Sequence, residues 1–185
     1  MNSYSTGKVT GTNFVGGLSG QATSAILSSY STSDVNGTAS DYTGGLVGSA
    51  ASSVKNSFSK GNVDGNRYVG GLIGYSSTSN TKDINNNYSI SRVNASNVPV
   101  SGFVGKRTQP DANIVFNAYW NPTLATKSTC YRDSSDVDTN TNCTAGTFID
   151  TNFFGATGIP FAALGFDANW VSQPSGYPKL SWQTN

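Results

Sequence analysis

Aromatic and apolar residues return along this chain at regular intervals, each time within the same local pattern of polar neighbours. A segment of the form Asn-Ser-Tyr-Ser-Thr-Gly-x-Val opens the chain and recurs three times with small changes. Its aromatic position returns at spacings of 26, 28, 30 and 31 residues, in Tyr4, Tyr30, Phe58, Tyr88 and Tyr119. Its valine, five positions later, returns at spacings of 26, 28 and 30, in Val9, Val35, Val63 and Val93. The chain therefore contains an internal repeat with a period of about 28 residues.

Two further apolar positions keep the same phase in every unit. A Gly-Gly-Leu block follows each valine, in Val15–Gly20, Thr43–Gly48, Val69–Gly74 and, in a degenerate form, Val100–Gly105. The position four residues before each aromatic is also apolar, as Ile26, Val54, Ile84 and Val115. Each unit thus holds two or three short strand-like stretches that are separated by Gly, Asn or Ser turns.

This pattern selects one repeat architecture. Helical repeats need helix formers, which are scarce here, and leucine-rich repeats need a Leu/Asn frame that is absent. One unit cannot bury its apolar face alone, whereas coils stacked about 4.8 Å apart can. We predict an all-β fold, a β-solenoid (β-helix) of four full coils and a fifth, partial one. Glycine pairs would allow positive φ at corners and close backbone approach, and an interior apolar column would contain Leu18, Leu46, Leu72 and Phe103.

The direction of the aromatic column has two interpretations. Strand alternation places the following serines, Ser5, Ser31, Ser59 and Ser89, on the opposite face. If the rings point outward, they form an exposed ladder that can stack on sugar rings. Parity with Ile26, Val54, Ile84 and Val115 favours rings in the core, with the serines outside or near a corner. The positions after each valine, Thr10, Asn36, Asp64 and Asn94, are expected to hydrogen-bond between coils.

The segment 119–185 breaks the period and contains all three tryptophans and both cysteines. A solenoid needs its last coil covered because exposed strand edges pair with other chains. We therefore divide one structural domain into a repeat region, 1–118, and a capping segment, 119–185, packed on the last coil. The N-terminus lies directly in the first repeat. We therefore expect earlier coils in a longer parent chain, or docking of the first coil on another domain.

Composition removes several classes of function. The chain of 185 residues has no His, its ten acidic residues are all Asp, and its formal net charge is +1. The absence of His excludes a Ser-His-Asp catalytic triad and a His-ligated metal site. The near-neutral chain also shows no basic stripe of the kind that binds nucleic acid. Apolar runs are too short to insert into a membrane. Asp34 and Asp64 lie one coil apart at different repeat positions, so they do not form an acid-base pair for a polysaccharide-degrading β-helix enzyme. We expect no catalytic residues and no cofactor.

With these residues in view, the chain resembles the GLUG-motif repeats of bacterial filamentous-haemagglutinin-like surface adhesins. The Gly-Leu-apolar-Gly signature stands at Gly45–Gly48 and Gly71–Gly74, with departures at Gly17–Gly20 and Gly102–Gly105. The resemblance covers residues 2 to about 120 and rests on four copies in register. It implies an extracellular, non-catalytic module at the bacterial cell surface.

The stretch between Cys130 and Cys143 carries two further predictions. Two cysteines in a Thr/Asn/Asp-rich loop suggest a disulfide, which an exported protein would retain; two free thiols are the alternative. Within this loop, oxygen ligands at Asp133, Asp136 and Asp138 could hold calcium, although the spacing is not that of an EF-hand. A solvated, turn-rich loop is the simpler interpretation and the one we favour.

We predict a secreted adhesin module, a rigid β-solenoid that contacts a glycan or protein on a host or neighbouring cell. The alternative is a carbohydrate-binding module that uses the aromatic residues of the cap, Tyr119, Trp120, Trp170, Tyr177 and Trp182. An ice-binding face would need aligned threonines. Thr6 and Thr32 align, but Lys60 and Ile90 interrupt that row.

Overall fold

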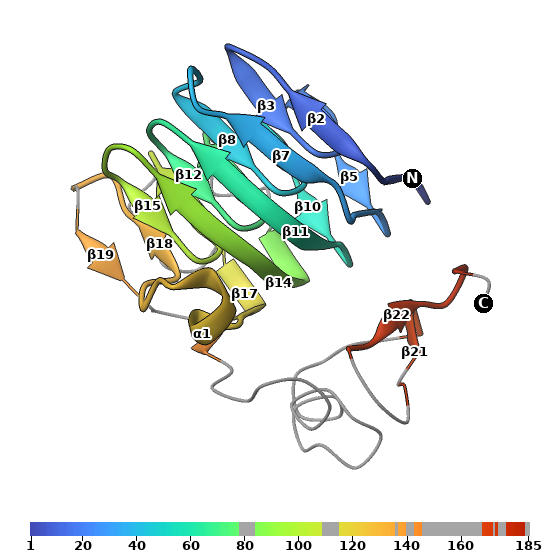
Figure 1. Cartoon of the computed structure of the whole chain (residues 1–185). Coiled ribbons are helices and arrows are strands. Elements are labelled where there is room, and N and C mark those ends of the chain that lie inside the picture. Colours follow the sequence, from blue (N-terminus) through green and yellow to red (C-terminus); the bar gives the residue numbers. More distant parts are fainter. Residues whose placement is uncertain are drawn as a thin grey trace.

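A computed structural model describes residues 1–77, 84–108, 115–135, 137–139, 143–145, 168–171, 173 and 177–183. Short strands wind into a β-solenoid of about four turns, as the repeat predicts (Figure 1). The division into segments 1–118 and 119–185 stays a prediction.

Each coil contributes strands to the same walls. The first coil contains β1 (Tyr4–Ser5), β2 (Lys8–Thr10), β3 (Phe14–Gly16) and β4 (Ser19–Ala22). The second contains β5 (Ile26–Leu27), β6 (Tyr30–Ser31), β7 (Asp34–Gly37), β8 (Tyr42–Gly44) and β9 (Val47–Ala50). The third contains β10 (Val54–Lys55), β11 (Phe58–Gly65), β12 (Val69–Gly70) and β13 (Ile73–Ser76). The fourth contains β14 (Ile84–Ala95), β15 (Val100–Ser101) and β16 (Val104–Arg107).

Pairing between the four coils is parallel and follows the repeat register. Tyr30 pairs with Phe58, Val35 with Val63, and Thr43 with Val69, so equivalent positions stack along the axis. The polar positions after the valines also align, and Asn94 donates from Nδ2 to Oδ1 of Asp64 at 2.9 Å. The predicted hydrogen-bonded ladder between coils is confirmed at this step.

The predicted apolar columns fill the interior. Leu46, Leu72 and Phe103 are fully buried, and the valine and Ile/Val columns line the other walls. Leu18, their equivalent in the first coil, is only half-buried because that coil has a neighbour on one side. Burial of these side chains is the main favourable contribution to stacking, at about 25 cal/mol per Å² of apolar surface.

The glycine pairs serve close approach and do not adopt positive φ. A Cβ on Gly45 would collide with the carbonyl oxygen of Gly71, and a Cβ on Gly71 with that of Gly102. Positive φ occurs instead at Gly7 and Gly61 and at a column of Asn and Ser residues, Asn2, Ser28, Asn56 and Asn86. The expectation of positive φ at the Gly-Gly corners is therefore wrong, whereas that of close approach is confirmed.

The left-handed residues overturn the parity argument for the aromatic column. Asn56, with φ of 51°, lies between Val54 and Phe58, so strand alternation does not continue from one to the other. The serines point inward: Ser31, Ser59 and Ser89 are buried, and Ser59 Oγ donates to the carbonyl oxygen of Gly71 at 2.6 Å. The rings of the aromatic column lie outside the coil, so the expectation of rings in the core and serines outside is wrong.

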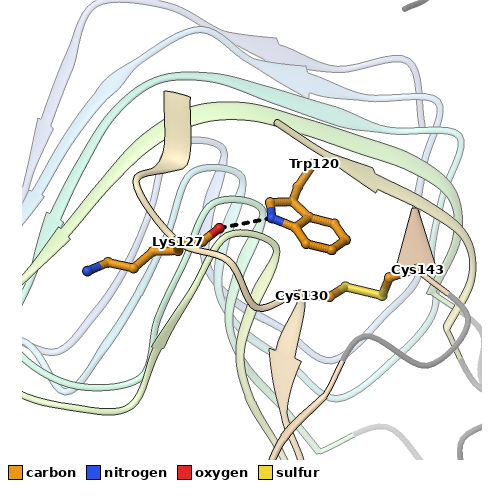
Figure 2. The surroundings of a disulfide bond; sticks show 4 residues. All are labelled: Trp120, Lys127, Cys130 and Cys143. Atoms are coloured by element: carbon orange, nitrogen blue, oxygen red, sulfur yellow. Dashed lines mark hydrogen bonds between the residues drawn. A yellow bond between two sulfur atoms is a disulfide. The ribbon is translucent and has the colours of Figure 1, made fainter. Parts of the chain in front are cut away.

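The last, partial coil closes one end of the interior. It contains β17 (Val115–Trp120), the short helix α1 (Pro122–Ala125) and β18 (Tyr131–Arg132), and β19 (Asp138–Thr139) pairs with β18. One further strand, β20 (Cys143–Ala145), pairs in parallel with β17, which pairs with β14 at its other edge. Trp120 is in register with Ser89, so its ring takes the inward position of the serine column and lies against Gly102. Its Nε1 donates to the carbonyl oxygen of Lys127 at 3.1 Å (Figure 2).

The predicted disulfide between Cys130 and Cys143 is confirmed, with its Cα atoms 6.3 Å apart. Phe103 and Val104 of the fourth coil donate their backbone N–H groups to the carbonyl oxygen of Cys130. Cys143 pairs with Ala118 of β17. The bond therefore joins the residue that precedes β18 to β20, beside Trp120, as Figure 2 shows.

Candidate binding surfaces

Four rings stack on the outside of the solenoid, Tyr4, Tyr30, Phe58 and Tyr88. Together with Tyr119, which follows them in backbone register, we call them the outer aromatic ladder. Ring centroids are 5.3 Å apart for Tyr4 and Tyr30, and 4.7 Å apart for Phe58 and Tyr88. Backbone register places Tyr119 beside Tyr88. Exposure falls from 59% at Tyr4 to 1% at Tyr88, so most of this ladder is covered.

The C-terminal segment covers the ladder. Its antiparallel strands β21 (Trp170–Val171) and β22 (Lys179–Leu180) place Trp170 with its ring centroid 5.4 Å from that of Tyr88. Trp182 reaches Tyr30 at 5.7 Å and donates from Nε1 to the carbonyl oxygen of Ser28 at 2.8 Å. The described part of the tail thus runs along the side of the solenoid, from the fourth coil toward the first.

The five rings predicted to bind glycan have different surroundings. Trp120 lies in the solenoid interior, Tyr119 is buried in the ladder, and Trp170, in the tail itself, is buried against the ladder. Tyr177 and Trp182 are half-buried against the ladder. Tyr177 stacks on Tyr88 with centroids 5.9 Å apart, and its hydroxyl accepts from Asn121 Nδ2 at 3.1 Å. Glycan binding at these rings stays a prediction. Tyr119, Trp170, Tyr177 and Trp182 pack where the tail meets the ladder, whereas Trp120 packs inside the solenoid.

Burial also changes the acidity of the ladder. Desolvation, with a smaller contribution from the nearby Tyr177, raises the pKa of Tyr88 well above its ordinary value. Desolvation likewise raises the pKa of Tyr119. Tyr88 uses the retained proton, because its hydroxyl donates to the carbonyl oxygen of Pro178 at 2.7 Å.

A second group of rings lies at a different corner, and we call it the corner cluster: Phe14, Tyr42, Tyr68 and Tyr75. Phe14 and Tyr42 stack with centroids 5.0 Å apart, and Tyr42 and Tyr68 at 5.4 Å. Tyr75 meets both tyrosines nearly edge-on, at 5.1 Å from Tyr42 and 5.9 Å from Tyr68. All four rings are half-buried. Partial burial, with the charges of Tyr75 and Tyr68, raises the pKa of Tyr42.

Close backbone packing at Gly74 places Tyr75, the fourth ring, at this corner. Gly74 packs directly on the backbone of Thr43, where an added Cβ would lie 2.6 Å from the Thr43 nitrogen. Tyr75 follows Gly74 in sequence and Tyr42 precedes Thr43, so the close approach of the two backbones places these rings in contact. The same glycines that allow coil packing therefore assemble the corner cluster.

Charged and amide side chains surround the corner cluster. The Arg67 guanidinium carbon lies 4.6 Å from the Tyr68 ring centroid, and Lys106 Nζ lies 5.7 Å from it. Beside the rings, Asn66 donates from Nδ2 to Oδ1 of Asp41 at 3.1 Å, and Asn97 donates to Asn66 at 2.6 Å. Rings, cations and an acceptor carboxylate thus share one surface.

Our sequence interpretation missed this cluster. Its signal is an aromatic residue directly before the Gly-Gly-Leu block in three successive units, at Phe14, Tyr42 and Tyr68. Tyr75 has no such signal, because its partners in the neighbouring coils are Ser49 and Lys106.

The predicted calcium ligands do not converge in the described residues. Asp133 accepts two backbone hydrogen bonds at Oδ1, from Ser135 and Val137, and Asp138 forms an ion pair with Arg132 at 3.8 Å. Asp136 lies outside the described residues. In the described part of the chain, no three Asp or Cys side chains group as metal ligands would. Calcium binding stays a prediction.

The two carboxylates considered for catalysis line one small hollow. Asp34 and Asp64 border a cavity of about 180 Å³ together with Lys8, Asn36 and Asn62. Asp34 Oδ1 accepts from both the backbone nitrogen and Nδ2 of Asn62, at 2.8 and 2.9 Å. These carboxylates therefore take part in hydrogen bonds between coils.

Comparison with protein-family models, curated proteins and solved structures gives no match for this chain. In the described ranges, no helix combines the length and apolar character needed to cross a membrane. The disulfide fits an oxidising environment.

Proposed function

We propose that this chain is a non-catalytic, secreted contact module that attaches cells or proteins through the side faces of a rigid solenoid. The observation that supports this proposal is that the inside and the outside of the solenoid carry different kinds of side chain. Interior positions are filled by apolar side chains and serines that pack the coils, whereas aromatic and charged side chains gather outside at the corner cluster. Such a surface suits binding, because it presents fixed side chains on a scaffold that does not need to move.

We place the module at the bacterial cell surface or outside the cell. The disulfide supports an oxidising compartment, and the resemblance to GLUG-repeat adhesins agrees with that setting. The partner would be a glycan or a protein on a host or neighbouring cell.

Further solenoid repeats are a second proposed partner. At the first coil, a hollow of about 420 Å³ is lined by Leu18, Ala22 and Ile26, which are apolar positions of the interior columns. Their equivalents one coil later, Leu46, Ala50 and Val54, are fully buried. A further parallel coil would bury this surface and pair its strand edges.

Cell binding tests the proposal. The fluorescently labelled chain is titrated onto intact epithelial cells and onto bacterial cells, with and without an excess of unlabelled chain, and read by flow cytometry. We expect saturable binding to at least one cell type, competed by the unlabelled chain and lost when the chain is unfolded and alkylated. A signal that rises linearly and resists competition on every cell type contradicts the proposal.

A further inference from the structure

We propose that the corner cluster, with Arg67 and Lys106, binds an acidic glycan, a polysaccharide that carries sulfate or carboxylate groups. This inference rests on the proposed function, which it deepens by naming a site and a ligand class.

The rings of the corner cluster are open to solvent in part. The outward positions of β11 are polar, as at Lys60, Asn62 and Asp64. The tail covers the outer aromatic ladder from Phe58 to Tyr119 and leaves its first-coil end open, whereas all four rings of the corner cluster keep part of their surface in contact with solvent. A group of half-exposed aromatic side chains in successive coils marks an interaction site.

The backbone at Tyr68 adopts an unusual conformation. Its φ is 45°, a left-handed conformation that bulky residues rarely adopt. Phe14 and Tyr42 occupy the equivalent position in the two preceding coils without positive φ. Strain kept at one residue of a surface cluster is typical of a functional position, since a relaxed alternative exists in the same fold.

The positive charges of Arg67 and Lys106 beside the rings select the ligand class. Arg67 is exposed, lies over the Tyr68 ring, and donates from Nη2 to the Tyr68 hydroxyl at 2.8 Å. This contact orients the planar guanidinium, whose other N–H groups can donate in pairs to a sulfate or carboxylate. Lys106 adds a second positive charge beside the same ring.

The rings and polar groups of the same surface suit the uncharged part of the ligand. Ring edges and faces contact the C–H groups of a sugar, while Asp41 and the tyrosine hydroxyls can accept and donate to its hydroxyl groups. The rings stack from the first coil to the third, so an extended polymer can follow the solenoid axis across them. Nucleic acid fits less well, because two cations and a net charge of +1 are a small basic surface.

Dextran sulfate and dextran provide a matched pair of probes, because they share a backbone and differ in the anionic groups. We expect dextran sulfate to bind the full chain in calorimetry, dextran not to bind, and affinity to fall with added salt. Polygalacturonate tests carboxylate in place of sulfate. Arg67→Gln and Tyr42→Ala should each weaken binding about tenfold or more, as expected for loss of a charge-assisted contact or an aromatic anchor. Lys60→Gln and Tyr4→Ala, on other faces, are the controls and should change affinity less than about twofold.

Circular dichroism and melting curves confirm that each variant is folded before its affinity is compared. The inference is overturned if neither acidic polymer binds, if dextran binds as well as dextran sulfate, or if the controls lose as much affinity as Arg67→Gln. If the chain binds cells and Arg67→Gln with Tyr42→Ala leaves that binding intact, the assigned site fails while the proposed function stands. If the chain binds no cell type, the proposed function itself fails.

Discussion

The hydroxyl of Tyr88 donates a hydrogen bond to the carbonyl oxygen of Pro178, 90 positions further along the chain, at 2.7 Å. This bond ties the tail to the fourth coil at the fourth ring of the outer aromatic ladder. Trp170 and Tyr177 pack around it, so the donor and acceptor are both shielded from water.

Removing this hydroxyl should loosen the tail. Tyr88→Phe keeps the ring and leaves the Pro178 carbonyl without its donor, which should cost about 1–2 kcal/mol of unfolding free energy. Urea denaturation measures the loss, and limited proteolysis should show faster cleavage of the tail. Tyr4→Phe, at the exposed end of the same ladder, is the control. Equal midpoints for the two variants would contradict this role for Tyr88.

The same residue should make stability depend on alkaline pH. Burial raises the folded-state pKa of Tyr88 above the unfolded value of about 10, so the folded state keeps the proton more tightly. The stabilisation that the protonated Tyr88 hydroxyl gives the folded state is fully present below about pH 10. It is lost as the pH rises toward the folded-state pKa. The difference in unfolding free energy between the wild type and Tyr88→Phe should therefore stay constant below about pH 9 and narrow as the pH rises from about 10 to 12. An unchanged difference in urea titrations between about pH 10 and 12 would refute the linkage.

The aromatic ladder also shows where sequence reasoning reached its limit. The period, the interior columns and the disulfide could be predicted, because each depends on spacing or composition alone. The direction of Phe58 could not, because the left-handed conformation of Asn56 changes the alternation and an Asn in a turn does not by itself reveal its φ. The covering of Tyr88 by Trp170 is a contact between distant segments, which no local pattern encodes.

The corner cluster is a different case. Its three stacked rings occupy one repeat position and were visible in the sequence, whereas the contact of Tyr75 with Tyr42 depends on the close approach at Gly74. The strained φ of Tyr68 and the position of Lys106 over its ring required the folded chain.

Glycine at position 71 should be indispensable to coil packing. In Gly71→Ala the new methyl group would collide with the Gly102 carbonyl oxygen and with Ser89 Oγ, and the first of these is backbone that cannot rotate away. We expect a loss of about 3 kcal/mol or more, at the upper end for overpacked cores. Gly7→Ala is the matched control, because its site is open and only its φ of 95° resists a side chain. It should cost about 1–2 kcal/mol. Thermal unfolding measures the melting temperature of each variant. The prediction is wrong if the melting temperature of Gly71→Ala equals or exceeds that of Gly7→Ala.

Loss of the disulfide should destabilise the closed end of the solenoid first. Replacing Cys130 and Cys143 together by alanine removes a cross-link that should contribute about 3 kcal/mol for a loop of this length. Amide hydrogen exchange should accelerate at Phe103 and Val104, whose N–H groups donate to the Cys130 carbonyl, and much less at Leu46 two coils away. Equal acceleration at all three amides would show that the bond has no local role.

The central claim is that this solenoid binds through the corner cluster and performs no chemistry. Chemical-shift mapping of the ¹⁵N-labelled chain during titration with dextran sulfate tests the location of the binding site. Measuring the polymer length before and after the titration tests the absence of chemistry. The account predicts shifts concentrated at Tyr42, Arg67, Tyr68, Tyr75 and Lys106, little change at Lys60 and Asp64, and a polymer of unchanged length. Shifts centred on another face of the solenoid, or a polymer shortened by incubation, would contradict it.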